Sequence, residues 1–179
     1  MTTISDPTRK RLRIRTMKEE DLDQVKVIDR MSFSLPWPDH SYDYEFYKNP
    51  LSLLWVAEVD ENEAKHRVVG TLVIWLIVDE AHIATIAVHP DYRNQGIAGQ
   101  MLAEALKAAV ERGMLQATLE VRASNTYAQQ LYNRFGFEIV GRRQRYYRDN
   151  NEDALIMTIQ NLDQAYLEWM DHTLAPHIP

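Results

Sequence analysis

Apolar residues recur along the chain in two patterns, and each pattern predicts one kind of element. Short runs rich in Val, Ile and Leu predict seven strands, at Leu12–Arg15, Leu53–Val59, Val68–Val78, Ala81–Val88, Ala117–Val121, Phe137–Val140 and Ala154–Ile159. Apolar spacings of three and four, together with capping residues and one aromatic-rich segment, predict helices at Asp21–Met31, Asp39–Lys48, Gly96–Arg112 and Asn125–Phe135. The second, third and fourth strands follow one another across short polar turns, which is typical of an antiparallel meander.

The length of 179 residues suits a single domain with short extensions. We expect residues 1–11 to form a leader, residues 12–160 the folded domain, and residues 161–179 a C-terminal tail. Within that tail, Gln164–Thr173 fits either a short terminal helix or a frayed end.

Composition narrows the chemistry that the chain can perform. The formal net charge of −6 argues against a broad nucleic-acid footprint, and the absence of cysteine excludes disulfides, thiolate metal sites and a cysteine nucleophile. The longest apolar run, Val68–Val78, is far shorter than the ~20 residues of a membrane span. The six histidines have no metal-ligand spacing, so we expect them to be structural or exposed, and we expect no metal site and a cytoplasmic location.

The stretch from Ile86 to Gly99 carries the first chemical signal. A strand ends there, a short basic loop follows, and a long helix begins with the small residues Gly96, Ala98 and Gly99. The unpaired N–H groups of a helix N-terminus attract anions, small residues permit close approach, and Arg93 adds charge. The stretch lacks the Lys-Ser/Thr ending of a P-loop and the G-x-G-x-x-G of a dinucleotide fold. It therefore indicates a diphosphate site, although the small residues could instead serve packing alone.

Arg93-x-x-Gly96-x-Ala98 resembles the acyl-CoA signature of the GNAT acetyltransferase superfamily, with Ala98 where many members have Gly. Five further stretches are similar to the bacterial ribosomal-protein-alanine N-acetyltransferases, namely Phe33–Trp37, Leu119–Asn125, Leu131–Phe137, Arg145–Tyr147 and Glu152–Met157. The resemblance runs from Leu12 to Gln160. It implies an α/β (α+β) GNAT fold, with a mixed, mostly antiparallel central sheet of about seven strands flanked by about four helices.

The resemblance also implies acetyl-CoA as the cosubstrate and a set of residues that hold it. The backbone of the strand end pairs with the pantetheine, the following loop and helix start hold the pyrophosphate, and an asparagine lies near the reacting end. The expected residues are Ile86, Ala87, Val88, Arg93, Asn94, Gln95, Gly96, Ile97, Ala98, Gly99 and Asn125.

Two side chains are candidates for proton transfer. Glu120 lies on a strand whose neighbours Leu119 and Val121 face the opposite side, and the resemblance gives it the role of general base. The alternative is an exposed strand residue paired with Arg122 or Arg143. Tyr132 is the expected general acid for the departing CoA thiolate, and the alternative is a packed aromatic residue. A backbone N–H near Val88 is expected to polarise the thioester carbonyl.

Two loops should flank a groove for the acceptor, one over Phe33–Trp37 and one over Tyr146–Asp153. The expected substrate-binding residues are Phe33, Pro36, Trp37, Tyr146, Tyr147 and Asp153, with Glu152 as a further acid that could favour an incoming amine. Trp37 could instead fill the core between two prolines.

The expected partner is a protein N-terminus, namely the N-terminal alanine of a small-subunit ribosomal protein, acetylated directly because no cysteine can carry the acyl group. A lysine side chain or a small-molecule amine is the alternative acceptor, and an acyl-CoA-binding module without turnover is a third reading. We expect a monomer or weak dimer, no membrane contact and at most indirect contact with nucleic acid. The basic clusters Arg9–Arg15 and Arg142–Arg148 are either solvated strand faces or docking surfaces for ribosomal RNA or an acidic protein.

Overall fold

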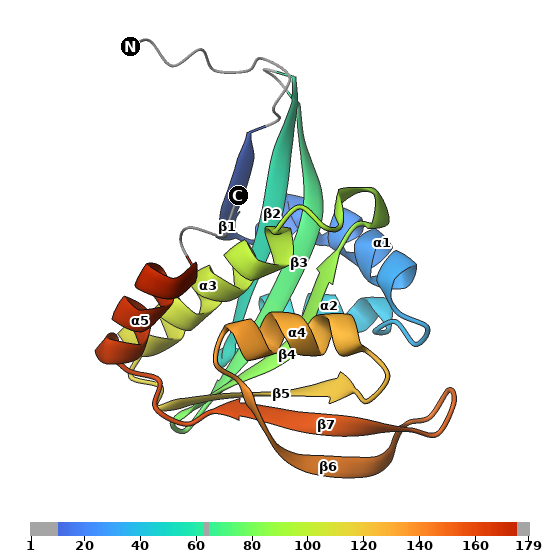
Figure 1. The fold of residues 1–179 in the computed structure, drawn as a ribbon. Helices are drawn as coiled ribbons and strands as arrows, with labels where there is room; N and C mark the ends of the chain where they lie inside the picture. The colour runs from blue at the N-terminus through green and yellow to red at the C-terminus, as the bar shows by residue number, and fades with distance from the viewer. Residues whose placement is uncertain (1–10, 63–64, 175–179) are drawn as a thin grey trace, which may run out of the picture.

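A computed structural model describes residues 11–62 and 65–174, so most of the expected leader lies outside the described residues. One seven-stranded sheet of order β1-β2-β3-β4-β5-β7-β6 forms the centre (Figure 1). Its strands are β1 (Leu12–Thr16), β2 (Ser52–Asn62), β3 (Lys65–Ile77), β4 (Glu80–Val88), β5 (Gln116–Arg122), β6 (Glu138–Tyr147) and β7 (Glu152–Ile159). The described residues also contain the helices α1 (Leu22–Ser32), α2 (Asp39–Tyr47), α3 (Ile97–Glu111), α4 (Thr126–Arg134) and α5 (Gln164–Leu174). The predicted mixed, mostly antiparallel sheet is confirmed.

The helices cover the sheet on both faces. Helices α1 and α2 lie on one face over a core that includes Val25, Tyr42 and Val73, whereas α3, α4 and α5 lie on the other over a larger core (Figure 1). On β5 the buried residues alternate with less buried ones, because successive strand side chains point to opposite faces. Leu119 therefore faces the larger core, and Glu120 faces the α1–α2 side.

Strands β4 and β5 form the parallel pair of the sheet, and they stay together for a short distance. Their register runs from Glu80 opposite Gln116 to Ile83 opposite Leu119. Beyond that point β4 continues to Val88 and β5 to Arg122, and the two strands diverge (Figure 1). A register shift between β3 and β4 at the same height bends β4 away from its neighbour. The fold thus opens a gap between the C-terminal ends of two adjacent strands.

Close packing holds the helix that follows this gap. Helix α3 buries a full stripe against the sheet, including Met101, Leu102 and Leu106. Opposite it, Gly70 on β3 has no side chain, and a Cβ there would lie 2.8 Å from the Met101 Cε atom. Glycine at this position therefore lets α3 approach the sheet closely.

The structure differs most from the predicted elements at β6, and it resolves the segment left open near the C-terminus. Strand β6 continues through Tyr147, whereas the sequence pattern predicts a strand that ends at Val140. Because β6 is an edge strand with most of its residues exposed, its second half has polar side chains and no apolar alternation. The segment left open as helix or frayed end is helix α5, and its Met170 and Leu174 are buried in the larger core.

Candidate active site

The expected cofactor residues surround the gap between β4 and β5. The end of β4, which continues beyond its pairing with β5, consists of Ile86, Ala87 and Val88. Helix α3 begins directly after the loop that follows. The loop is pinned by Arg93, whose Nε donates to the Val88 carbonyl at 3.1 Å and whose Nη2 donates to Ser32 Oγ at 3.2 Å. The N-terminus of α3, with its unpaired N–H groups, therefore begins shortly after the end of β4 that borders the gap.

Backbone geometry explains the small and polar residues of this loop. Gly96, the N-cap of α3, has a φ of 75°, and Asn94 has a φ of 61°, a region in which glycine and asparagine are the usual residues. Gln95 is exposed, Ala98 is half-buried, Ile97 is buried, and Gly99 lies against Leu131 and Phe135 of α4. This arrangement leaves the first turn of α3 free of bulky side chains on the side of the gap.

The start of α4 borders the same gap. Asn125 caps the helix, because its Oδ1 accepts a hydrogen bond from the Ala128 N–H at 3.1 Å. Tyr127, the second residue of the helix, donates its hydroxyl to Asn94 Oδ1 at 2.6 Å and so connects α4 to the β4–α3 loop. Sequence patterns gave no sign of this contact, because the two residues belong to different motifs.

Glu120 lies on β5 just beyond the last residue paired with β4, and its side chain is only 9% exposed. His82 Nε2 lies 3.2 Å from its Oε2, and Arg143 Nη2 lies 2.9 Å from its Oε1. The hydrogen bond with His82, together with the positive charge of Arg143, holds the pKa of the Glu120 carboxyl below its usual value although burial opposes this. The carboxylate therefore stays ionised at neutral pH in a largely enclosed position.

His82 belongs to the site, whereas we expected every histidine to be structural or merely exposed. It lies on β4, its ring stacks on Trp75 at 5.5 Å, and Trp75 stacks in turn on Trp37 at 6.2 Å. The Trp75 Nε1 donates to Glu45 Oε2 at 2.9 Å. A row of flat rings thus runs beneath the site and ends at Glu120, and Trp37 is part of this packing.

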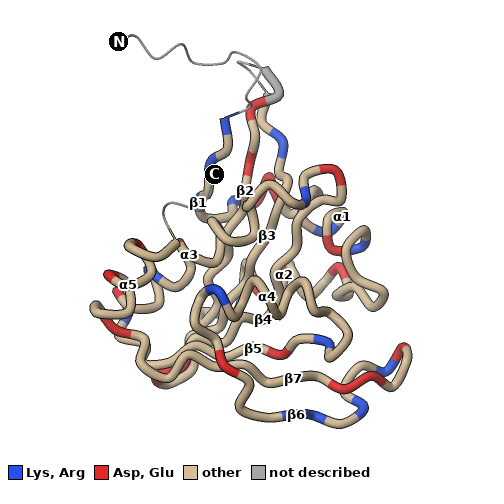
Figure 2. Tube along the Cα trace, viewed as in Figure 1, with Lys and Arg blue, Asp and Glu red and all other residues tan. Residues whose placement is uncertain are grey.

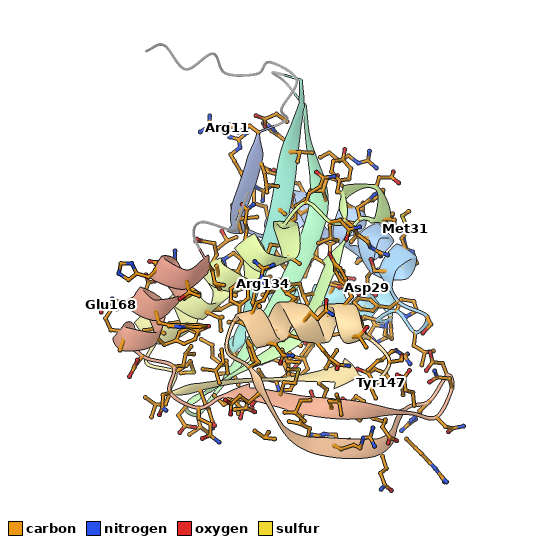
Figure 3. The ribbon with its side chains drawn as sticks, viewed as in Figure 1. Arg11, Asp29, Met31, Arg134, Tyr147 and Glu168 are labelled. Carbon is orange, nitrogen blue, oxygen red and sulfur yellow. The ribbon has the colours of Figure 1, made fainter. Side chains whose placement is uncertain are left out.

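Tyr132 lies on α4, almost fully buried, with its ring packed edge-on against Phe137 at 5.8 Å. Burial raises its pKa, so the phenol stays protonated. Tyr147 interacts electrostatically with both Tyr132 and Glu120. Burial raises the pKa of Tyr147 to about 12, with smaller contributions from Tyr146, Glu120 and Glu152, although the charge of Arg122 opposes this. Figure 3 shows Tyr147 near the end of β5, below α4. Tyr147 therefore lies near both expected proton-transfer residues.

The two expected substrate loops meet at the end of β5. Ser34, in the loop after α1, donates its hydroxyl to Asp149 Oδ2 in the β6–β7 turn. The second loop is shorter than expected, because Tyr146 and Tyr147 belong to β6 and Asp153 belongs to β7. Asp153 accepts from the Arg145 N–H at 2.8 Å and pairs with Arg142, so its carboxylate is engaged within the hairpin.

Asp29 of α1 holds the loop that follows α1, the first of the two expected substrate loops. It is 1% exposed, and its carboxylate accepts hydrogen bonds from the Trp37 N–H and the Tyr42 hydroxyl, each at 2.7 Å (Figure 3). Burial raises the pKa of Asp29 although both hydrogen bonds oppose this. Pro36 lies within the fixed loop, and Phe33 at its start stays partly exposed, at 38%.

Four arginines of the two basic clusters pair with acids. Arg13 pairs with Asp60 at 2.7 Å, Arg15 pairs with Asp21 at 2.7 Å, and Arg142 and Arg143 of β6 pair as described above, while residues 9 and 10 lie outside the described part. A cavity of about 740 Å³ lies between Arg13, Arg15 and neighbouring residues, away from the gap. Within residues 11–62 and 65–174, no group of three or more His, Asp or Glu residues has the arrangement of a metal site.

Comparison with protein families shows which family the chain belongs to. The acetyltransferase (GNAT) family matches residues 22–137 of the chain, which include the gap, the α3 N-terminus and both proton-transfer candidates. The chain belongs to the GNAT acetyltransferase family.

Curated relatives agree with this membership. The chain is 39% identical over 146 residues to the putative ribosomal protein bS18-alanine N-acetyltransferase of Bacillus subtilis, with 82% of this chain and 93% of that protein covered. It is 33% identical over 161 residues to an N-alpha-acetyltransferase of Sulfurisphaera tokodaii, covering 83% and 92%. The crystal structure of the Escherichia coli ribosomal-protein-S18-alanine N-acetyltransferase superposes with a TM-score of 0.74 at 28% identity, covering 83% and 93%.

As a GNAT enzyme, the chain is an acetyl-CoA-dependent N-acetyltransferase. The diverging strands, the small residues at the α3 start and the loop held by Arg93 border one gap, which has at one end the kind of helix N-terminus that favours anions. The residues that sequence reasoning missed, His82 and Tyr127, contact the expected ones across elements, and spacing along one element cannot reveal such contacts.

Proposed function

We propose that this chain is an N-alpha-acetyltransferase that moves acetyl from acetyl-CoA to the N-terminal alanine of a small-subunit ribosomal protein of the bS18 kind. The observation that carries this proposal is the 39% identity to a Bacillus subtilis protein named for that reaction, over 93% of its length. The enclosed, ionised Glu120 beside the cofactor gap supports it. The cytoplasm, where such a substrate is made, is the proposed location.

In this proposal the free end of β4 pairs with the pantetheine through the backbone of Ile86, Ala87 and Val88. The residues from Arg93 to Gly99 hold the pyrophosphate at the α3 N-terminus, where helix N–H groups favour a diphosphate. Asn125 contributes near the thioester while its Oδ1 caps α4.

Glu120 acts on the incoming amine. An α-amine has a pKa of ~7.7–8.0, so roughly one amine in seven is already neutral at pH 7. Because Glu120 has a lowered pKa, it is a weak proton acceptor on its own. Its role is therefore to hold the ammonium in place until one proton has left to solvent, and to accept through water the second proton, which the neutral amine loses as its nitrogen bonds to the carbonyl carbon.

Tyr132 acts on the leaving group. A phenol has a pKa of ~10 and a thiol one of ~8.5, so complete proton transfer to the CoA thiolate is uphill before burial is considered. Burial raises the pKa of Tyr132 further. Tyr132 therefore stabilises the thiolate by donating a hydrogen bond as the C–S bond breaks, and the proton from the amine completes the balance.

The acceptor peptide lies between the two loops. Phe33 and Tyr146 are partly exposed there and can contact it, whereas Trp37 contributes as the packed wall behind them. Pro36 and Asp153 hold the loops in shape, and Tyr147 borders the reacting groups. This puts an extended N-terminus within reach of Glu120.

Mass spectrometry of acceptor mixtures tests the proposal. Peptides that begin with Ala, Ser or Met are offered together with free lysine and polyamines, with acetyl-CoA as donor. We expect acetyl on the N-terminal alanine of a bS18-like peptide. Acetyl found on side-chain amines alone would replace the proposal with the lysine alternative, whose amine at a pKa of ~10.4 demands a stronger base or a drier site. Sedimentation of the same preparation tests the expected monomer or weak dimer.

A further inference from the structure

Arg122 occupies a position that the reaction described above does not use. It lies on β5 two residues after Glu120, so both side chains leave the strand on the same face. Its side chain is 23% exposed and lies where the loop after α1 meets the β6–β7 turn. Figure 2 shows basic and acidic segments meeting at this end of β6 and β7.

Both terminal nitrogens of the Arg122 guanidinium donate hydrogen bonds in this position. Its Nη2 donates to Asp149 Oδ2 at 2.7 Å and to Ser34 Oγ at 3.1 Å. Its Nη1 donates to Glu152 Oε2 at 3.1 Å and to Asn150 Oδ1 at 3.2 Å. The guanidinium carbon also lies 3.9 Å from the centre of the Tyr147 ring, the geometry of a cation–π contact.

The two carboxylates that accept from Arg122 are held in their ionised form. The Ser34 hydroxyl, followed by Arg122, lowers the pKa of Asp149, and hydrogen bonds from Ser124 lower the pKa of Glu152 to about 2. Both acids are therefore ionised at any pH at which the enzyme works. A planar guanidinium can serve several such acceptors at fixed angles, which a lysine ammonium cannot do.

We propose that Arg122 is a positioning residue that joins the two acceptor loops and holds Tyr147 beside the reacting groups, so that the peptide groove has its working shape before substrate binds. This inference rests on the proposed function for the identity of the acceptor. It assigns Arg122 no contact with the reacting atoms, because its donors are engaged by the loops. The residue acts on peptide binding, and acetyl-CoA binds at the other side of the sheet gap.

Steady-state kinetics with both substrates tests this role. Arg122→Gln should raise KM for the acceptor peptide by about tenfold, since charge-assisted hydrogen bonds between the loops are lost, while KM for acetyl-CoA changes less than twofold. Arg122→Lys should raise KM for the acceptor peptide by only slightly less than Arg122→Gln does. The matched control is Arg13→Gln on β1, an arginine that also pairs with two carboxylates and lies far from the loops. It should leave both KM values unchanged.

Hydrogen exchange gives a readout that does not depend on turnover. Amides of residues 33–37 and 147–152 should exchange at least about tenfold faster in Arg122→Gln than in the wild type. Asp149→Asn should reproduce this faster exchange, and this smaller change is less prone to prevent folding. Unchanged peptide KM, or unchanged exchange in both loops, overturns the proposal. If the wild-type chain acetylates no N-terminus, the proposed function fails, and the exchange experiment still decides whether Arg122 joins the loops.

Discussion

Glu120 shows how one residue acquires its properties from neighbours that are distant in sequence. Its strand position alone is compatible with an exposed acid paired to Arg122 or Arg143. The structure selects Arg143 and adds His82, and Arg122 turns away to the loops. With a cation or donor on each oxygen, the carboxylate is fixed in direction and charge, which suits a group that must orient an ammonium.

Replacement of Glu120 should matter most where the acceptor amine is charged. The lowered pKa keeps Glu120 ionised from acid to alkaline assay pH, so the acid limb of kcat/KM follows the amine at ~7.7–8.0. Glu120→Gln should therefore reduce kcat/KM by about 10²-fold at pH 6.5 and by much less at pH 9. The measurement is a pH profile of wild type and variant beside the exposed control Glu104→Gln. An equal loss at every pH contradicts the assignment.

Tyr132→Phe removes one hydroxyl and keeps the buried ring against Phe137. We expect kcat to fall by about 10- to 100-fold, because the thiolate loses its hydrogen-bond donor as it leaves. The dissociation constant for acetyl-CoA, measured by calorimetry, should change less than twofold.

The choice of acyl donor sharpens the Tyr132 experiment. A thioester with a more acidic thiol needs less help to depart, so the variant should lose less activity with that donor. Tyr166→Phe on α5 is the matched control, since it removes a hydroxyl that donates to the Phe135 carbonyl at the end of α4. An identical loss with both donors would separate Tyr132 from the leaving group.

At the scale of elements, apolar periodicity identifies what is half-buried and fails where an element is exposed. It predicts α3 and β4 almost to the residue, since both have one face in the core. It stops β6 seven residues early, because the second half of this edge strand has solvent on most sides. The expected loop at Tyr146 is wrong for that reason, and the true turn is confined to residues 148–151.

A substitution in helix α5 tests whether the C-terminal segment is part of the folded unit. Met170 is 1% exposed and belongs to the core under α3 and α4. Met170→Ala should lower the free energy of unfolding by about 2–5 kcal/mol, the usual cost of truncating a buried methionine.

Urea denaturation measures this cost beside a matched control. Glu168→Ala, on the exposed side of the same helix, should change the free energy of unfolding by less than about 0.5 kcal/mol (Figure 3). A Met170→Ala cost near zero would mean that α5 adds nothing to the stability of the domain.

Across the whole molecule, the expected cofactor residues lie together in the sequence, whereas the residues that sequence reasoning missed act through contacts between separate elements. Residues 86–99 form one continuous stretch, so their placement around a single gap could be predicted from the motif. His82, Arg122, Tyr127 and Arg143 matter through contacts between elements, as when Tyr127 meets Asn94 from 33 positions away. Such contacts depend on the twist and divergence of strands, and these are properties of the assembled sheet.

The arrangement of the assembled sheet also favours acetyl transfer in one step, with both substrates bound. The pairing of β4 and β5 ends at Ile83 and Leu119, and the expected acceptor loops meet at the end of β5, two residues after Glu120. Both substrates can therefore be present together, and the chain has no cysteine that could store an acetyl group between them. Acetyl should pass directly from sulfur to nitrogen within a ternary complex.

Initial-rate kinetics distinguishes this direct transfer from a two-step path. Double-reciprocal plots at several fixed acceptor concentrations should intersect, because each substrate affects the slope for the other. Intact-mass measurement after incubation with acetyl-CoA alone should find unmodified enzyme. Parallel lines, together with an acetylated enzyme that passes its acetyl group to added peptide, would show that another side chain carries the acyl group, and the arrangement around Glu120 would then need a different chemical role.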